Sequence, residues 1–492
     1  MKKIVIIGAG MGGLATALRL SNLGYEVSIY EKLSKPGGRT NLITENGFRV
    51  DTGPTILVMK KSFDEFYQSI EENIEDRVKF IQLDPNYRIY FHDKTYMDLS
   101  NNMAQLAREM ERFVPGSAEW VFKFIGDSAK KYELGMGFVD RNYDRITDLA
   151  NPSALVKLLQ TRAHQNLYNQ VSRYFHGDDK FSKAFSFHSM FLGLSPMKAL
   201  AMYSLITYAD IALGMWYPQG GIYRIIEDMV LLCRQKGVQL FTSSPVKQII
   251  INDGMAKGIL LESGKEIRAD IVISNADLPY TYRYLLSEKY RKPYTIAKLA
   301  HMDYACSGFL LYLGLDRTYP NMQHQALYFS KDYKSNLDAI FKFKQIPDDP
   351  SFHLNNPTIT DPSLAPPGHH LLYILAPMPN LQSNINWQEE SPKVRNLLIH
   401  KLQEIVDPDI EKHIIWEKRY TPMDFQQDFN AVYGTAFGSL SQGFFQSSYF
   451  RPHNVASKVK NLFFVGQATY PGIGMPMVLI SSKLVIERII NG

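Results

Sequence analysis

Cysteine is scarce in this sequence. Only 2 cysteines, Cys233 and Cys306, occur among 492 residues, and neither belongs to a Cys-x-x-Cys pair. We therefore expect no disulfide framework, no zinc or other metal site, and a reducing compartment. Each thiol is interpreted as a small hydrophobic side chain within the core.

Long apolar runs are also missing. No uncharged apolar run reaches ~18 residues, so we expect no membrane-spanning helix. The sequence has no internal repeat, no low-complexity tract and no stripe of interleaved basic and aromatic residues, which argues against a repeat architecture and against nucleic-acid binding. The formal net charge of +5 is modest. It suits either weak attraction to an anionic membrane surface or an ordinary solvated surface.

The residues that are present indicate a globular protein. Hydrophobic residues make up 45% of the chain and charged residues 21%, and these proportions allow a sizeable core. A length of 492 residues is sufficient for two or three domains.

A glycine-rich turn follows the first apolar run. The β-branched run Ile4–Ile7 predicts a buried parallel strand, and Gly8, Gly10 and Gly13 then form a G-x-G-x-x-G pattern that opens a helical stretch. Such glycines permit a tight turn and let the helix N-terminus approach a pyrophosphate, because its N–H groups and dipole attract anions. The pattern predicts a dinucleotide site.

An acid and a second glycine motif favour the same interpretation. Glu31 ends a second predicted strand, Glu26–Tyr30, where it can accept hydrogen bonds from ribose hydroxyls. In the following Gly37-Gly38-Arg39, Gly38 permits close approach and Arg39 can pair with phosphate oxygens. The alternative is a secretory signal peptide with a charged start, which would leave these later residues without a role. In FAD enzymes of the glutathione-reductase and amine-oxidase type, Gly-Gly-Arg follows the ribose acid, so this resemblance favours FAD over NAD.

The order of predicted elements indicates an α/β fold. We predict strands within 79–99, a mostly helical region over about 102–216, an amphipathic helix over 222–236, and a closing helix over 482–490. Further strands are predicted at 237–241, 246–251, 270–276, 309–313, 371–375 and 461–466. The charge-poor segment Met197–Tyr217 is interpreted as a buried core helix or, alternatively, a helix that dips into a membrane.

These elements predict a Rossmann-like FAD-binding domain of the glutathione-reductase and amine-oxidase type. A second, sheet-based substrate domain and a helical membrane-associated region accompany it. We assign the FAD-binding domain to 1–70, 221–300 and 449–492, the substrate-domain strands to 71–101 and 301–448, and the helical region to 102–220.

Motifs across the whole chain resemble those of the bacterial carotenoid (phytoene) desaturase family. The motifs that carry the resemblance are 8–31, 37–39, 51–55, 184–189, 421–425, 449–452 and, most specifically, 461–476. Around 303–307 and 364–366 the chain is most similar to the C30 members, the dehydrosqualene (4,4′-diapophytoene) desaturases. Residues 467–470 depart from the small-residue and His pattern usual before Pro471.

This resemblance implies an FAD-dependent oxidoreductase that removes two hydrogens from an allylic C–C bond of a polyene. Oxidised flavin accepts a hydride at N5 and a proton leaves the neighbouring carbon. The expected activity converts a C30 precursor to yellow diapocarotenoids such as diaponeurosporene. The alternatives are a C40 phytoene desaturase, a flavin-dependent oxidase that forms a terminal aldehyde, an amine oxidase, and a non-catalytic carotenoid-binding protein.

The resemblance also implies the site residues. Asp148 is the candidate proton acceptor, and His188 is a second ionisable candidate. The residues implied in FAD binding are Gly8, Gly10, Gly13, Glu31, Gly38, Arg39, Gly53, Pro54, Thr55, Val246, Gly466, Gly474 and Met475.

The implied partners follow from the apolar substrate. We expect a long-chain polyene, a membrane surface, and quinone or oxygen as the final electron acceptor, with no nucleic acid. Because the substrate is dissolved in the bilayer and no spanning helix is predicted, we expect a cytoplasmic protein that is peripheral on the cytoplasmic membrane face.

Overall fold

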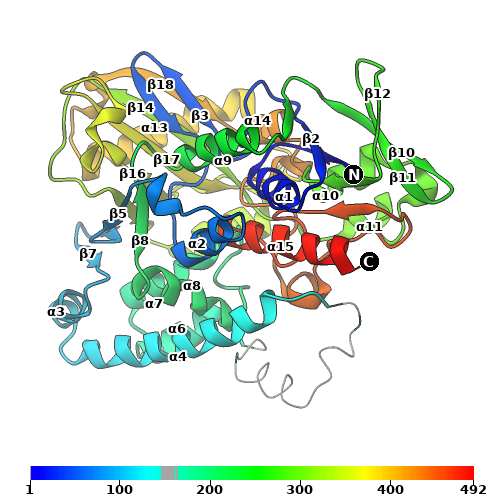
Figure 1. Cartoon of the computed structure of the whole chain (residues 1–492). Helices are drawn as coiled ribbons and strands as arrows, with labels where there is room; N and C mark the ends of the chain where they lie inside the picture. The colour runs from blue at the N-terminus through cyan, green and yellow to red at the C-terminus, as the bar shows by residue number, and fades with distance from the viewer. Residues whose placement is uncertain (1, 144, 146–160, 162–164, 492) are drawn as a thin grey trace.

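The computed structural model describes residues 2–143, 145, 161 and 165–491 (Figure 1). Its first sheet is parallel and has the strand order β19-β13-β1-β2-β9. These strands are Leu462–Phe464, Ile271–Ser274, Lys3–Ile7, Glu26–Tyr30 and Gln239–Phe241. The predicted strands at both chain ends are confirmed, and segments hundreds of residues apart lie side by side in one sheet. The apolar run of β1 is buried because both faces of a parallel sheet are covered.

Helices α1 (Met11–Asn22), α9 (Tyr223–Gln235) and α15 (Met475–Asn491) lie close to this sheet, and α1 contacts both α9 and α15. Leu14 and Leu18 of α1 are fully buried in a core shared with Ile6 of β1. Cys233 is a free, buried thiol of α9, as is Cys306 elsewhere in the chain. The packing brings the start of α1 and the start of α15 to the same edge of the sheet.

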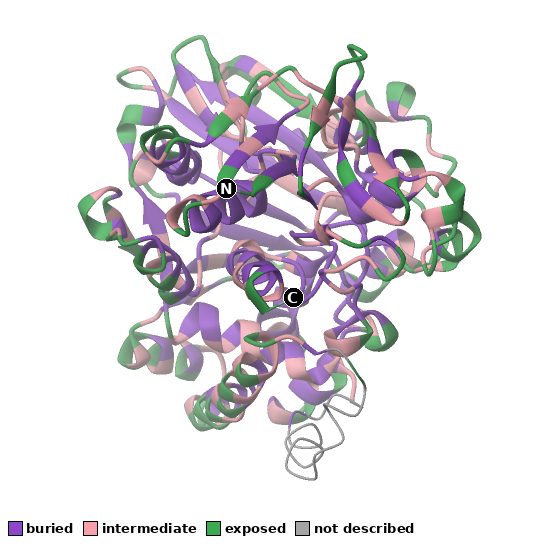
Figure 2. Cartoon of the chain, turned by 45° about the vertical axis from the view of Figure 1, so that its right-hand side comes forward, coloured by how far each residue is buried: buried purple, intermediate pink, exposed green. Residues whose placement is uncertain are grey.

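A second sheet has the order β18-β14-β17-β16-β15-β6-β7, antiparallel except where β15 pairs with β6. The strands are Ile414–Tyr420, Ser307–Leu315, His370–Met378, Phe352–Asn355, Gln325–Phe329, Tyr87–Phe91 and Tyr96–Leu99. Every residue of β14 is buried. Figure 2 shows buried residues along the central strands and exposed residues on the outer loops. Trp387 and Leu398 of α13 (Trp387–Ile405) share a core with one face of this sheet.

The helical region contains α3 (Met103–Phe113), α4 (Ser117–Val139), α6 (Leu167–Tyr174), α7 (Asp179–Ser186) and α8 (Ser204–Ile211). The prediction of one helix over Met197–Tyr217 is wrong. Only α8 and a 3-10 turn are helical there, because Gly214 (φ +85°) follows the helix and β8 (Met215–Pro218) pairs with β5 (Phe80–Leu83). Most of the segment is nevertheless buried, as the core interpretation expects.

Smaller elements complete the fold. Asn46 and Gly47, with φ of 51° and 81°, form the predicted turn between β3 (Leu42–Glu45) and β4 (Phe48–Asp51). A three-stranded sheet joins β10 (Val246–Asn252), β11 (Met255–Leu261) and β12 (Glu266–Arg268). The remaining α-helices of the described residues are α2 (Lys60–Gln68), α10 (Leu278–Tyr280), α11 (Ile296–His301), α12 (Tyr333–Asp338) and α14 (Pro422–Phe429).

Candidate active site

A cavity of about 490 Å³ lies at the carboxyl ends of the parallel strands, where open α/β sheets bind ligands. Its lining includes 10–12 at the start of α1, residues 31–33 after β2, 275–277 after β13 and 465–469 after β19. The segment 428–430 and residues 436, 437 and 439 supply the opposite wall. The cavity wall therefore combines the carboxyl ends of the parallel strands with the segment 428–439, which follows β18 of the second sheet.

The glycine turn brings the chain closely around α1. Gly8 has a φ of +94°, and a Cβ on Gly13 would lie 2.2 Å from the Gly8 carbonyl oxygen. Gly13 is therefore required for helix–strand packing rather than for lining the cavity. A Cβ on Gly10 would lie 2.9 Å from the Asn275 side-chain oxygen, so the turn leaves a cradle that side chains would fill. The N-terminus of α1 faces this cradle, as an anion site requires.

Glu31 is fixed by backbone donors at the end of β2. Its two carboxylate oxygens accept the Ala9 N–H at 2.7 Å and the Leu33 N–H at 2.8 Å. Burial raises the pKa of Glu31 above its ordinary value, although these N–H groups oppose the shift. A carboxylate has about four acceptor positions, so Glu31 retains acceptor capacity for a ribose hydroxyl.

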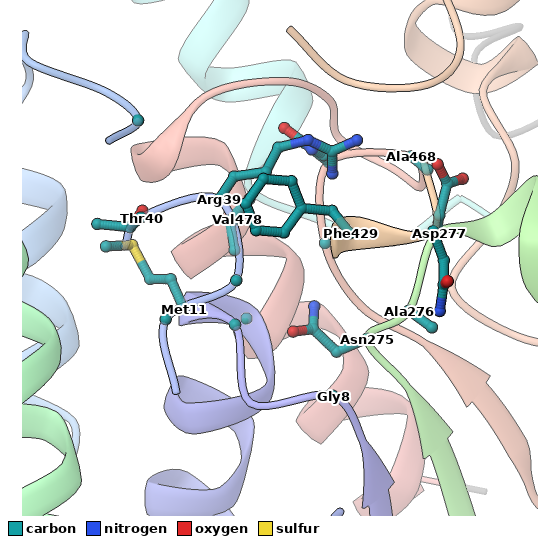
Figure 3. Close-up of a pocket in the computed structure, with 18 of the residues that line it drawn as sticks. Gly8, Met11, Arg39, Thr40, Asn275, Ala276, Asp277, Phe429, Ala468 and Val478 are labelled. Atoms are coloured by element: carbon teal, nitrogen blue, oxygen red, sulfur yellow. The ribbon is translucent and has the colours of Figure 1, made fainter. Parts of the chain in front are cut away.

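Arg39 presents a cation to the cavity (Figure 3). Its Nε is buried and has no hydrogen-bond partner among the described residues, while a terminal nitrogen donates to the Thr435 carbonyl at 3.3 Å. The guanidinium lies 6.0 Å from the centre of the Phe429 ring. Burial lowers the pKa of Arg39, and nearby Asp277 opposes that shift. A buried donor without a partner at a cavity wall fits an incoming phosphate oxygen.

The C-terminal glycines form another part of the wall. Gly466 and Gly474 have φ values of +122° and +111°, which favour glycine. A Cβ on Gly474 would meet only Pro476, at 3.9 Å, so the cavity side of this turn is open. Helix α15 begins at the next residue, Met475, and its positive N-terminus faces the cavity.

Other lining residues are apolar, and their part of the wall is called the apolar end below. They are Phe191, Leu310, Leu375, Phe437 and Ile473, which come from five separate segments. The polar end and the apolar end together fit a dinucleotide whose reactive ring meets a hydrocarbon substrate.

Most predicted site residues reach this cavity. Gly13 lies behind the turn, Thr55 lines a separate small cavity, and Asp148 lies outside the described residues. His188 does not line the cavity and is buried against Asp210 at 3.0 Å and Thr207 at 3.2 Å. The predicted residues that line the cavity are Gly8, Gly10, Glu31, Gly38, Arg39, Gly53, Pro54, Val246, Gly466, Gly474 and Met475.

Several lining residues were not predicted from the sequence. Asn275 lies near the end of the predicted strand 270–276 and Asp277 directly follows it, so the rule that parallel strands bind ligands at their carboxyl ends is the available signal. Asp277 accepts a hydrogen bond from Ser439 at 2.5 Å, and burial raises its pKa. Lys32 donates to the Gln427 carbonyl and to Asn430 at 3.0 Å. No local sequence signal indicates the contribution of 427–439.

Comparison with known proteins identifies the family. Residues 11–490 match the family described as flavin containing amine oxidoreductase. The chain is 40% identical to a zeta-carotene-forming phytoene desaturase of Myxococcus xanthus, covering 100% of this chain and 94% of that protein. It is 35% identical to a 4,4′-diapophytoene desaturase (4,4′-diapolycopene-forming) of Methylomonas sp, covering 99% and 96%.

The chain therefore belongs to the flavin-containing amine oxidoreductases and, within them, to the carotenoid desaturase family. It is an FAD-dependent oxidoreductase. A crystal structure of an oxidoreductase from Methanosarcina mazei shares the fold, with a TM-score of 0.65, 19% identity, and coverage of 99% of this chain and 100% of that chain.

Proposed function

We propose that this desaturase acts on the C30 precursor dehydrosqualene (4,4′-diapophytoene) and forms yellow diapocarotenoids such as diaponeurosporene. The single observation that carries the proposal is that one cavity is lined both by Glu31 and Arg39 and by the apolar residues Phe191, Leu310 and Phe437. A hydrocarbon offers no polar group, so its binding rests on apolar burial, worth about 25 cal/mol per Å². Similarity over the whole chain to a C30 desaturase supports the same substrate.

The residues that would hold FAD follow from the site. Glu31 would accept from the ribose, Arg39 and the start of α1 would bind the pyrophosphate, and the start of α15 would face the flavin. Bound FAD would supply a two-electron acceptor. The apolar walls would exclude water and orient the hydrocarbon, and we retain Asp148 as the candidate proton acceptor. The domain assignment made from the sequence remains part of this proposal.

A C40 phytoene desaturase is the second candidate. The specific observation in its favour is the 40% identity to a zeta-carotene-forming phytoene desaturase. Because discrimination between hydrocarbons is shallow, at ~1–3 kcal/mol per methylene-sized misfit, one cavity can accept both lengths. A terminal oxidase that forms an aldehyde shares the same cofactor site and differs in its product.

We further propose that the protein works as a peripheral protein on the cytoplasmic membrane face, with quinone or oxygen as the final acceptor. The substrate's solubility in lipid supports this location. In the part of the chain that the structure describes, no helix is long and apolar enough to cross a membrane.

Pigment analysis tests these assignments. The chain is expressed in cells that make dehydrosqualene, in cells that make phytoene, and in cells that make a coloured C30 carotene. We expect yellow desaturated C30 products in the first. Coloured products only in the cells that make phytoene would instead identify a C40 phytoene desaturase. Oxygenated products formed only from the coloured C30 carotene would identify a terminal oxidase.

A further inference from the structure

Three exposed phenylalanines form a cluster on the loop 443–450, hereafter the aromatic loop. Phe444, Phe445 and Phe450 have exposed fractions of 46%, 77% and 45%. Their ring centres lie 5.1 Å, 5.9 Å and 6.3 Å apart, so the rings pack against one another. Large apolar side chains grouped on a surface mark an interaction site more often than single ones.

The base of this loop is held rigidly by Arg451, which is fully buried. Its guanidinium donates only to backbone carbonyls in the bonds observed, and burial lowers its pKa to about 10. The acceptors are Thr469 at 3.0 Å, Gln446 at 3.2 Å, Leu440 and Ser441 at 3.5 Å, and Gln467. These hydrogen bonds give a structural reason for the motif Tyr449-Phe450-Arg451-Pro452, whose residues do not line the cavity. These bonds hold the base of the loop in place, which lowers the cost of ordering the loop when it binds a partner.

A basic segment, 288–303, runs beside the aromatic loop. Asp303 N–H donates to Gln446 of the loop at 2.9 Å, and Ser457, which follows the loop in the chain, donates to the Lys292 carbonyl at 3.3 Å. The segment is therefore attached to the loop at Asp303 and to the chain after the loop at Lys292. Lys289, Lys292 and Lys298 are exposed and form no ion pair among the described residues. The segment also contains Arg291, and its only acidic residues are Glu288 and Asp303, so its net charge is positive. Lysines beside exposed aromatic rings match the charge and polarity of an anionic lipid interface.

The same loop is continuous with the cavity wall. Phe437 and Ser439 line the cavity, and Ser439 bonds Asp277. Gln442, one residue before the aromatic loop, accepts the N–H of cavity-lining Ile473 at 2.9 Å. A membrane docked on the loop would therefore lie next to the wall of the cavity.

We propose that the aromatic loop inserts into the interface of an anionic bilayer while the segment 288–303 binds lipid headgroups. This deepens the proposed function, since it rests on a substrate that is dissolved in lipid. The segment Met197–Tyr217, the other candidate for docking, is mostly buried and exposes fewer apolar side chains. We therefore propose that the aromatic loop binds a lipid surface. Failure of the wild-type protein to bind vesicles would instead favour a protein partner for this loop.

The test is flotation of the full-length holoprotein with vesicles of equal parts phosphatidylglycerol and phosphatidylcholine. The variant Phe444→Ser/Phe445→Ser/Phe450→Ser is compared with Leu231→Ser/Ile415→Ser, which removes apolar side chains that are 46% and 51% exposed on α9 and β18. We expect the wild-type protein and the control to float, and the loop variant to partition at least ~10-fold more weakly. Lys289→Gln/Lys292→Gln/Lys298→Gln should weaken binding and remove much of its salt dependence.

Two further readouts separate docking from catalysis. Flavin content and desaturation of substrate in detergent micelles should be unchanged in the loop variant, and Phe445→Trp should show blue-shifted emission with vesicles. Flotation of the loop variant like wild type, or emission that vesicles leave unchanged, would overturn the proposal. Loss of activity in micelles would equally overturn it, since the loop would then act in the reaction. If wild type does not desaturate C30 or C40 substrates in micelles, the proposed function fails while flotation still decides the docking surface.

Discussion

The two ends of the cavity are built in different ways. At the nucleotide end, Gly8, Glu31 and Arg39 come from one short stretch of chain and act through backbone geometry and hydrogen bonds. At the apolar end, Phe191, Leu310 and Phe437 come from distant segments and act through shape. Recognition of the nucleotide is therefore local and specific, while recognition of the hydrocarbon depends on the whole tertiary structure.

The energetic consequence is a difference in sensitivity. Removing a buried hydrogen-bonding group leaves its partners unsatisfied, at about 1–3 kcal/mol. Exchanging one apolar wall residue for another of similar volume usually costs less than about 1.5 kcal/mol. Mutations at the nucleotide end should therefore abolish or strongly reduce cofactor binding, and mutations at the apolar end should shift substrate preference.

The largest effect is expected for Gly13→Ala. The added Cβ would lie 2.2 Å from the Gly8 carbonyl oxygen, so α1 must move away from β1. We expect about 1–3 kcal/mol of destabilisation and loss of bound flavin. The matched control is Gly126→Ala in α4, where a Cβ meets nothing within 4 Å. Thermal unfolding and flavin absorbance measure both variants, and a Gly13→Ala protein as stable and as yellow as the control would contradict the account.

Glu31→Ala should weaken FAD binding by about 1–3 kcal/mol, since the Ala9 and Leu33 N–H groups and the ribose lose their acceptor. Glu31→Gln retains one side-chain carbonyl and should lose less. Titration of the apoprotein with FAD gives the dissociation constants. Equal affinity of the wild-type protein and both variants for FAD would show that Glu31 does not contribute to FAD binding.

Acid sensitivity should arise from the second sheet rather than from the nucleotide end. Burial lowers the pKa of His324 and His353 to about 3. Because their folded pKa lies below the unfolded value, the stability they contribute is lost as the pH falls from about 6.5 towards 3, at about 1.4 kcal/mol per pH unit and histidine. Burial raises the pKa of Asp51 to about 6, so this residue acts in the opposite direction between about 4 and 6.

The pH prediction is checked by unfolding His353→Gln at several pH values. The glutamine can still donate towards Gln325, which His353 contacts at 2.5 Å, but it cannot be protonated. We expect a shallower loss of stability below pH ~6.5 than in wild type. Parallel curves would show that His353 does not carry the acid sensitivity.

The smallest effect is expected for Phe437→Leu at the apolar end. Leucine enlarges the cavity slightly, so the ratio of C40 to C30 turnover should rise less than ~10-fold, with flavin content unchanged. Competition between the two precursors in one assay measures this ratio. Loss of flavin from this variant would show that substrate preference cannot be changed at Phe437 without also changing cofactor binding.

The sequence allowed local elements to be predicted better than contacts. The strands β1 and β2, the Asn46-Gly47 turn and the closing helix follow from residue patterns with short range. The helix predicted over Met197–Tyr217 was wrong, because β8 is stabilised by pairing with a strand more than a hundred residues earlier.

The site shows the same limit. Eleven of the predicted cofactor residues line the cavity. Glycine motifs and a strand-terminal acid give geometric reasons for Gly8, Glu31 and Arg39, whereas Gly53, Pro54 and Val246 were implied only by the family resemblance. Asn275 and Asp277 were reachable from the strand they follow, but Phe191, Phe429 and Thr435 were not, since aromatic residues and backbone carbonyls have no distinctive spacing. Arg451 belongs to the motif 449–452, and only the structure reveals the backbone carbonyls to which its guanidinium donates.

In the proposed reaction, this cavity would bring a hydrocarbon precursor to flavin held by Glu31 and Arg39. The most direct measurement is anaerobic mixing of the purified holoprotein with dehydrosqualene in lipid vesicles, followed by absorbance. We expect loss of the oxidised-flavin bands together with the appearance of the bands of a longer conjugated C30 polyene. Flavin that stays oxidised and a substrate that stays colourless, in a protein that retains its full flavin content, would contradict it.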